Sequence, residues 1–65
     1  MPTLRVSLFP GRTVETKRKL AEAFTQAFVE IGGAKREGVE VIFEEIHKDD
    51  WIRGGWPDAD ADKKD

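Results

Sequence analysis

The chain has 65 residues, no cysteine and a net charge of −2, with acidic and basic residues interspersed. The absence of cysteine excludes a disulfide framework and a thiolate metal site. The mixed charges give no basic surface typical of nucleic-acid binding. No apolar run is long enough for a membrane span or a signal peptide, so we expect a cytoplasmic protein. Because a domain this small buries little core and no disulfide braces it, we expect a homo-oligomer.

The first predicted element is a β-strand over residues 4–8, where polar residues alternate with the apolar Leu4, Val6 and Leu8. Pro2 stands at the head of this strand, one of the few sheet positions that proline tolerates, because it has no backbone donor. Pro10 and Gly11 are turn residues and end the strand.

A helix is predicted from Thr13, its N-cap, to about Ile31. Apolar residues form one stripe at three- and four-residue spacing, consisting of Leu20, Phe24, Ala27, Phe28 and Ile31. The basic run Lys17, Arg18 and Lys19 is interpreted as a solvated face. The pair Gly32-Gly33 ends the helix, a usual place for a left-handed cap.

The stretch "GVEVIFEEI" (38–46) predicts a second strand, so the two strands form a parallel pair joined by a right-handed crossover. This unit leaves a sheet edge and a sheet face uncovered, which partner subunits would cover. Gly54-Gly55 predicts a tight hairpin turn. We assign residues 1–56 to one domain and 57–65 to a disordered acidic tail.

Several of these features, in this order, resemble the 4-oxalocrotonate tautomerase family: Met-Pro, an alternating strand, "GRT" before a lysine-rich helix start, "VEVIFEEI", then an aromatic residue and "GG". The resemblance covers residues 2 to about 56. It implies an α/β fold made of a single β-α-β unit with a short C-terminal hairpin. Its two parallel strands are completed into a four-stranded sheet by dimerisation, commonly within a hexamer. No cofactor and no metal ion are expected.

The resemblance makes Pro2 the catalytic base, once removal of Met1 has freed its amine. An α-amino group has an unperturbed pKa of about 7.7–8.0, and an apolar pocket or a nearby cation lowers that pKa, which leaves a neutral amine able to act as a general base. Arg12 is expected to grip a substrate carboxylate and to stabilise charge on the oxygen during enolisation, since a guanidinium is permanently charged and binds carboxylates bidentately.

Trp51 and Glu40 complete the candidate substrate-binding residues. Trp51 stands where family members carry an aromatic pocket wall, and a place in a subunit interface is compatible with this role. Glu40 departs from the family, because tautomerases of diacids carry a second arginine there. A carboxylate at this position would repel a second substrate carboxylate and would raise the pKa of Pro2. Arg5 and Arg53 are the alternative sources of a second cation.

The expected function is a cofactor-free keto–enol tautomerase of a small unsaturated 2-hydroxy or 2-oxo acid, a monocarboxylate rather than a diacid. One alternative is a hydratase or dehalogenase of a small unsaturated acid, in which Glu40 activates water while a protonated Pro2 acts as the acid. The other is a non-catalytic oligomeric family member, with Glu40 as a surface residue. His47 lies near two aspartates but lacks complementary ligands, so we expect it to be solvated rather than metal-bound.

Overall fold

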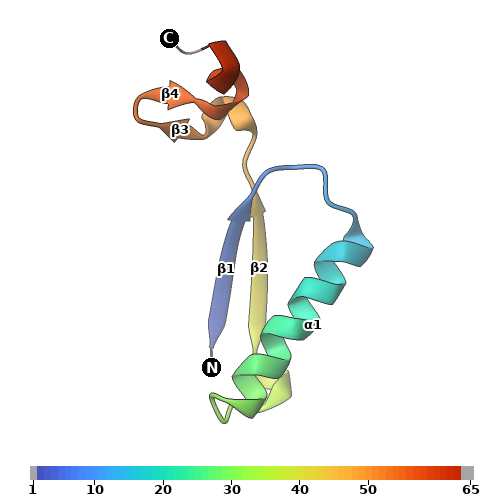
Figure 1. Ribbon diagram of the computed structural model, residues 1–65. Coiled ribbons are helices and arrows are strands. Elements are labelled where there is room, and N and C mark those ends of the chain that lie inside the picture. Colours follow the sequence, from blue (N-terminus) through green and yellow to red (C-terminus); the bar gives the residue numbers. More distant parts are fainter. Residues whose placement is uncertain (1, 64–65) are drawn as a thin grey trace.

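The computed structural model describes residues 2–63 and consists of a β-α-β unit followed by a hairpin (Figure 1). Its elements are β1 (Thr3–Leu8), α1 (Val14–Glu30), β2 (Glu40–Glu45), β3 (Ile52–Arg53) and β4 (Trp56–Pro57). Short 3-10 turns cover Arg36–Gly38, Lys48–Asp50 and Asp58–Lys63. The predicted α/β fold, with two strands joined by a helix and a short hairpin after them, is confirmed.

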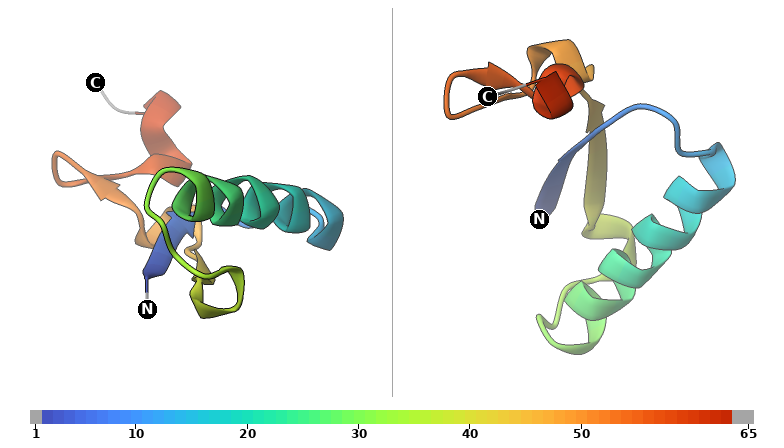
Figure 2. Two further views of the ribbon diagram at one scale, coloured as in Figure 1. Left: turned by 90° about the horizontal axis from the view of Figure 1, so that it is seen from below. Right: turned by 45° about the horizontal axis from the view of Figure 1, so that its top comes forward.

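The sheet consists of β1 and β2, which pair in parallel with a register from Thr3↔Glu40 to Leu8↔Glu45. Side chains alternate between its two faces, as the strand pattern predicts. The half-buried face is apolar and carries Leu4, Val6, Leu8, Val41 and Phe43. The helix α1 lies along one side of this sheet, and the described residues contain no second α-helix to cover the other (Figure 2).

The helix begins and ends where the sequence predicts. Thr13 is the N-cap, and its Oγ1 accepts a hydrogen bond from the Thr16 backbone N–H at 3.1 Å. Beyond the helix, Gly33 takes the left-handed conformation at φ 71°. Along the predicted apolar stripe, Leu20, Phe24 and Phe28 are half-buried, but Ala27 and Ile31 are exposed. Ile31 is the C-cap and follows the last residue of α1, Glu30.

The carboxyl-terminal segment consists of the hairpin and the turns that follow it. Gly54 and Gly55 have φ values of 61° and 78°, which is the geometry of a type I′ turn between β3 and β4. Asp58–Lys63 forms 3-10 turns, and Trp56 Nε1–H donates to the Asp60 carbonyl at 2.6 Å. Residues 64 and 65 of the predicted tail lie outside the described residues, and the disorder of residues 57–65 stays a prediction. The predicted domain boundary at residue 56 stays a prediction.

A single chain does not enclose a core. Among the residues whose side chains the structure describes, none is buried. The radius of gyration is 15.5 Å, whereas a compact domain of this length has one of about 11 Å. The hairpin extends beyond the end of the sheet rather than folding back over it (Figure 1). Of the helices within residues 2–63, none has the length and apolar character needed to cross a membrane.

Candidate active site

The amino ends of β1 and β2 hold two of the predicted site residues, Pro2 and Glu40. Pro2 is half-buried, and its carbonyl oxygen accepts a hydrogen bond from the Glu40 backbone N–H at 3.0 Å. The exposed Glu40 carboxylate accepts a hydrogen bond from the Thr3 hydroxyl at 3.3 Å. We call these three residues the amino end of the sheet. Glu40 therefore lies beside the residue that carries the predicted base.

The other two predicted residues, Arg12 and Trp51, lie beyond the opposite end of the sheet. Phe9 connects them, because its ring meets that of Trp51 edge-on with centroids 4.7 Å apart, and its carbonyl accepts a hydrogen bond from Arg12 Nη1 at 3.4 Å. Lys48 Nζ lies 5.2 Å from the centroid of the Phe9 ring, within the range of a cation–π contact. We call this cluster of Phe9, Arg12, Lys48 and Trp51 the carboxyl end.

A shallow hollow of about 300 Å³ adjoins the carboxyl end, on the polar face of the sheet. It is lined by Ser7, Ile46, Asp50, Trp51 and Ile52. Trp51 is half-buried and forms part of its wall. An indole beside a solvent-open hollow provides an apolar surface for a small organic ligand.

Within one chain, the two ends are too far apart to form one site. The six residues of β1 rise about 3.3 Å each, so roughly 20 Å of strand separates Pro2 from the loop that carries Arg12. The structure thus brings Pro2 together with Glu40, and Arg12 together with Trp51, but it does not bring the two pairs together.

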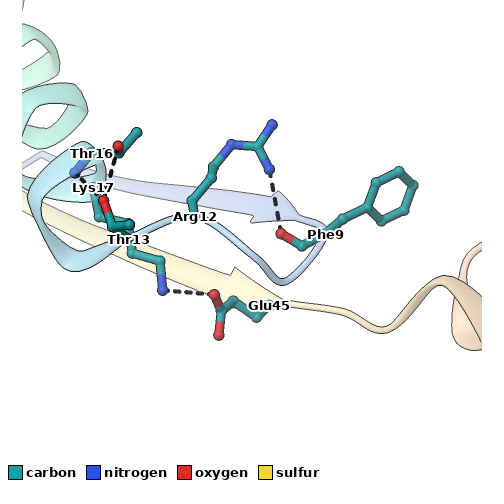
Figure 3. Close-up of polar contacts among 6 residues, drawn as sticks. All are labelled: Phe9, Arg12, Thr13, Thr16, Lys17 and Glu45. Atoms are coloured by element: carbon teal, nitrogen blue, oxygen red, sulfur yellow. Dashed lines mark hydrogen bonds and ion pairs between the residues drawn. The ribbon is translucent and has the colours of Figure 1, made fainter.

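The loop that carries Arg12 (residues 9–13) is closed by an ion pair between Lys17 of α1 and Glu45 of β2. Their charged atoms are 2.7 Å apart, and only 24% of the Lys17 side chain is exposed. The interpretation of Lys17 as part of a solvated face is therefore wrong, whereas Arg18 and Lys19 are exposed. Figure 3 shows this contact on one side of the loop and the Arg12 guanidinium pointing away from it.

The two alternative cations for a diacid substrate are paired within the chain. Arg5 lies 3.7 Å from Glu44, and Arg53 lies 3.3 Å from Asp58. His47 caps the turn Lys48–Asp50, since its Nδ1 accepts a hydrogen bond from the Asp49 backbone N–H at 3.2 Å. Neither arginine is free of a carboxylate partner of its own chain.

Sequence reasoning did not single out Phe9, Lys48 or the pair Lys17–Glu45. Two signals for the pair were present. Lys17 lies in the first turns of α1, where the helix dipole disfavours a cation, and Glu45 has the same strand parity as the apolar Val41 and Phe43 that face α1. A cation that the helix dipole disfavours and a carboxylate on an apolar strand face, on elements that face each other, indicate a contact between the two side chains.

The sequence of this chain is similar to those of known proteins. Residues 2–60 match the model of a family described as tautomerase enzyme. The 2-hydroxymuconate tautomerase of Bacillus subtilis is 42% identical over 55 residues, covering 85% of this chain and 89% of that protein.

Two solved structures are similar throughout. One is TomN, a 4-oxalocrotonate tautomerase homologue in the tomaymycin biosynthetic pathway (36% identity, TM-score 0.89, 97% of each chain covered). The other is a heterohexamer 4-oxalocrotonate tautomerase from Chloroflexus aurantiacus (30% identity, TM-score 0.85, 94% of this chain and 98% of that one covered).

Proposed function

Because this chain belongs to the tautomerase family and is an isomerase of that family, we propose that it is a cofactor-free keto–enol tautomerase of a small unsaturated 2-hydroxy or 2-oxo acid. The observation that carries this proposal is the position of Pro2, directly after Met1 and half-buried at the head of β1. Removal of Met1 turns this proline into a secondary amine that the adjoining strand holds in place.

In the proposed reaction, the Pro2 amine takes the proton from the 2-hydroxyl of the enol and a proton is returned at a carbon of the unsaturated chain. An unperturbed α-amino group has a pKa of about 7.7–8.0. An apolar wall disfavours the protonated amine and lowers this pKa, which supplies more of the neutral base at neutral pH. Trp51 of another subunit is the proposed wall.

Arg12 is the proposed partner of the substrate carboxylate. Its guanidinium is exposed and makes one long hydrogen bond, to the Phe9 carbonyl at 3.4 Å. The remaining N–H groups are thus available to bind a carboxylate bidentately and to stabilise the negative charge that develops on the adjacent 2-oxygen.

The separation of the two ends supports a site made by two subunits. A two-fold axis that pairs the sheets of two copies antiparallel sets the amino end of one beside the carboxyl end of the other, and it completes a four-stranded sheet. Each such dimer has two equivalent sites, and a hexamer of three dimers has six. The exposed Ile31 and Ile42 are further apolar surface that an oligomer would cover.

Glu40 favours a monocarboxylate substrate in this scheme. Its backbone N–H is bonded to the Pro2 carbonyl and its carboxylate to the Thr3 hydroxyl, and the two arginines that might have offset its charge, Arg5 and Arg53, face Glu44 and Asp58. A substrate with a second carboxylate near this end would meet a like charge, which costs binding free energy unless a cation compensates it.

The same proximity of Glu40 to Pro2 favours a second candidate function, the addition of water to a small unsaturated acid. Here the Glu40 carboxylate would orient and deprotonate water while protonated Pro2 donates a proton to the substrate. Assays with one unsaturated acid distinguish the two functions, since hydration adds a water molecule to the product mass and tautomerisation leaves the mass unchanged.

The decisive test compares the processed protein with protein that retains Met1, each verified by intact mass. An amide nitrogen at Pro2 has no basic lone pair, so retention of Met1 should slow ketonisation of an enolpyruvate by about 10²–10⁴-fold, the contribution of a positioned general base. The oligomer should be unchanged by light scattering. Equal rates from the two forms would show that Pro2 merely begins a strand.

A further inference from the structure

The position of the Arg12 guanidinium depends on the backbone of the loop 9–13 (Figure 3). The side chain is exposed, and its one hydrogen bond, to the Phe9 carbonyl, is 3.4 Å long. Gly11 within the loop has φ 121°, a conformation that other residues rarely adopt. A loop of this kind places Arg12 reproducibly only if both of its ends are fixed.

The strand side of the loop is fixed by two contacts at the end of β1. The Ile46 backbone N–H donates to the Leu8 carbonyl at 2.8 Å, which extends the pairing of β1 with β2. The Phe9 ring packs edge-on against Trp51 at 4.7 Å. Movement of the loop relative to the sheet is therefore restricted at Phe9.

The helix side is tied to the sheet through Lys17. Thr13 is bound to the first turn of α1, because its carbonyl accepts from the Lys17 backbone N–H at 3.0 Å and its hydroxyl accepts from the Thr16 N–H at 3.1 Å. The Lys17 ammonium in turn reaches Glu45 at 2.7 Å, and Glu45 is the register partner of Leu8. One ion pair thus closes a ring from β1 through the loop and α1 back to β2.

This ion pair differs from an ordinary surface pair on the same helix. Lys19 and Glu15 are 3.7 Å apart and 77% and 80% exposed, whereas Lys17 and Glu45 are 2.7 Å apart and 24% and 39% exposed. A lysine in the first turns of a helix is also disfavoured by the helix dipole. Lys17 is therefore poorly explained by the stability of α1 itself and well explained by its contact with Glu45.

From this ring of contacts we infer that Lys17 and Glu45 are positioning residues, which hold the Arg12 loop in the geometry that binds the substrate carboxylate. The inference rests on the proposed function of Arg12. Neither residue touches the guanidinium in the structure, so their action runs through the backbone of residues 12–17. Without the pair, the first turn of α1 moves relative to β2, and Arg12 moves with it.

The test uses the processed, oligomeric protein and four forms of it: Lys17→Met, Glu45→Gln, the charge swap Lys17→Glu with Glu45→Lys, and Lys19→Met as the matched control. Methionine keeps most of the aliphatic stem of Lys17 and removes its charge. Two substrates are compared, an aryl-substituted enolpyruvate and its primary amide, which has no carboxylate for Arg12 to bind.

We expect Lys17→Met and Glu45→Gln to lower kcat/KM for the carboxylate substrate by about tenfold, mainly through KM. This lies between the small effect of a surface ion pair and the about 100-fold effect of a 1 Å displacement of a positioned group. The amide keeps only the 2-oxygen contact with Arg12, so its kcat/KM should fall less than that of the carboxylate, by about two- to threefold. The charge swap should recover part of the loss, and Lys19→Met should have no effect. Equal losses on both substrates, or no loss on either, would overturn the inference.

Hydrogen exchange provides a readout that does not depend on catalysis. The amides of Thr16 and Lys17, both bound to Thr13, should exchange about three- to tenfold faster in Lys17→Met. If the lysine acted on the helix alone, its removal would relieve the dipole and slow this exchange. A wild-type protein that turns over neither substrate contradicts the proposed function, and the exchange rates then decide whether the ion pair fixes the loop.

Discussion

The two ends of the sheet are built in different ways. At the amino end, Pro2 and Glu40 are held by strand pairing and by one hydrogen bond from Thr3. At the carboxyl end, the loop that carries Arg12 is surrounded by an edge-on aromatic pair, a cation–π contact, a helix cap and a half-buried ion pair.

This difference follows from what each end has to fix. A proline that begins a strand has a ring-locked φ and is oriented by the strand itself, so few further contacts are needed. An arginine has several rotatable bonds and sits in a loop with Gly11, so its placement needs contacts from several elements. The loop that carries Arg12 is therefore held by side-chain contacts, whereas Pro2 is held by backbone pairing.

The largest expected effect comes from inactivating Pro2 in one form of the protein and Arg12 in another. Pro2 blocked by retained Met1, and Arg12→Gln, should each lower ketonisation by about 100-fold or more. An equal mixture of the two inactive forms is then unfolded and refolded together. If each site takes Pro2 from one subunit and Arg12 from another, each of these residues is intact with a probability of about one half. About a quarter of the sites then contain both intact residues.

Activity near about a quarter of the wild-type value is thus the expected result for the mixture, measured after subunit exchange is confirmed by native mass spectrometry. Each inactive form refolded alone is the control. A refolded mixture as inactive as its components would mean that Pro2 and Arg12 of one chain act together, contrary to the roughly 20 Å of strand between them.

A smaller effect is expected from changing the charge of the amino end alone. Glu40→Arg should raise turnover of a dicarboxylic dienol relative to a monocarboxylic one by about tenfold, since it replaces a repulsive charge by an attractive one. It should also lower the pKa of the Pro2 amine, so that the acidic limb of the pH–rate profile moves to lower pH. Glu40→Gln separates removal of the anion from addition of the cation. A substrate ratio that stays the same within error would place Glu40 outside the site.

The smallest expected effect lies in the hairpin beyond the carboxyl end. A Cβ at Gly55 would meet no atom within 4 Å, but the residue has φ 78°, so Gly55→Ala introduces backbone strain without a clash. We expect a loss of about 1–2 kcal/mol of unfolding free energy per chain, measured by urea denaturation, with little change in kcat. Gly55→Asn, which tolerates this conformation better, should lose less. An alanine variant as stable as the wild type would show that the turn does not need a left-handed residue.

Much of this fold was predictable from periodicity. Alternation over residues 4–8 and 38–46 and the spacing of Leu20, Phe24 and Phe28 indicate β1, β2 and α1, and Gly54-Gly55 indicates the hairpin. The turns Arg36–Gly38 and Lys48–Asp50 were not predicted, because three residues are too few to show a period. The turns in Asp58–Lys63 were not predicted either, because a short polar segment carries no periodic apolar pattern.

The roles of the candidate site residues stay predictions, but part of their arrangement could be predicted from the sequence. Pro2 and Glu40 begin parallel strands, while Arg12 and Trp51 follow strand ends, so the topology alone already separates them into two groups. The contact between Lys17 and Glu45 joins residues far apart in the sequence and depends on how α1 lies on the sheet, which local patterns do not determine.

The lack of any buried side chain among the described residues of one chain has a consequence for how the protein behaves on dilution. When the folded form exists mainly in association, the law of mass action makes its unfolding temperature rise with total protein concentration. Specific activity would then decrease once the protein is diluted below a threshold concentration. A newly synthesised chain would gain both its stability and its catalytic activity when it associates with a second copy.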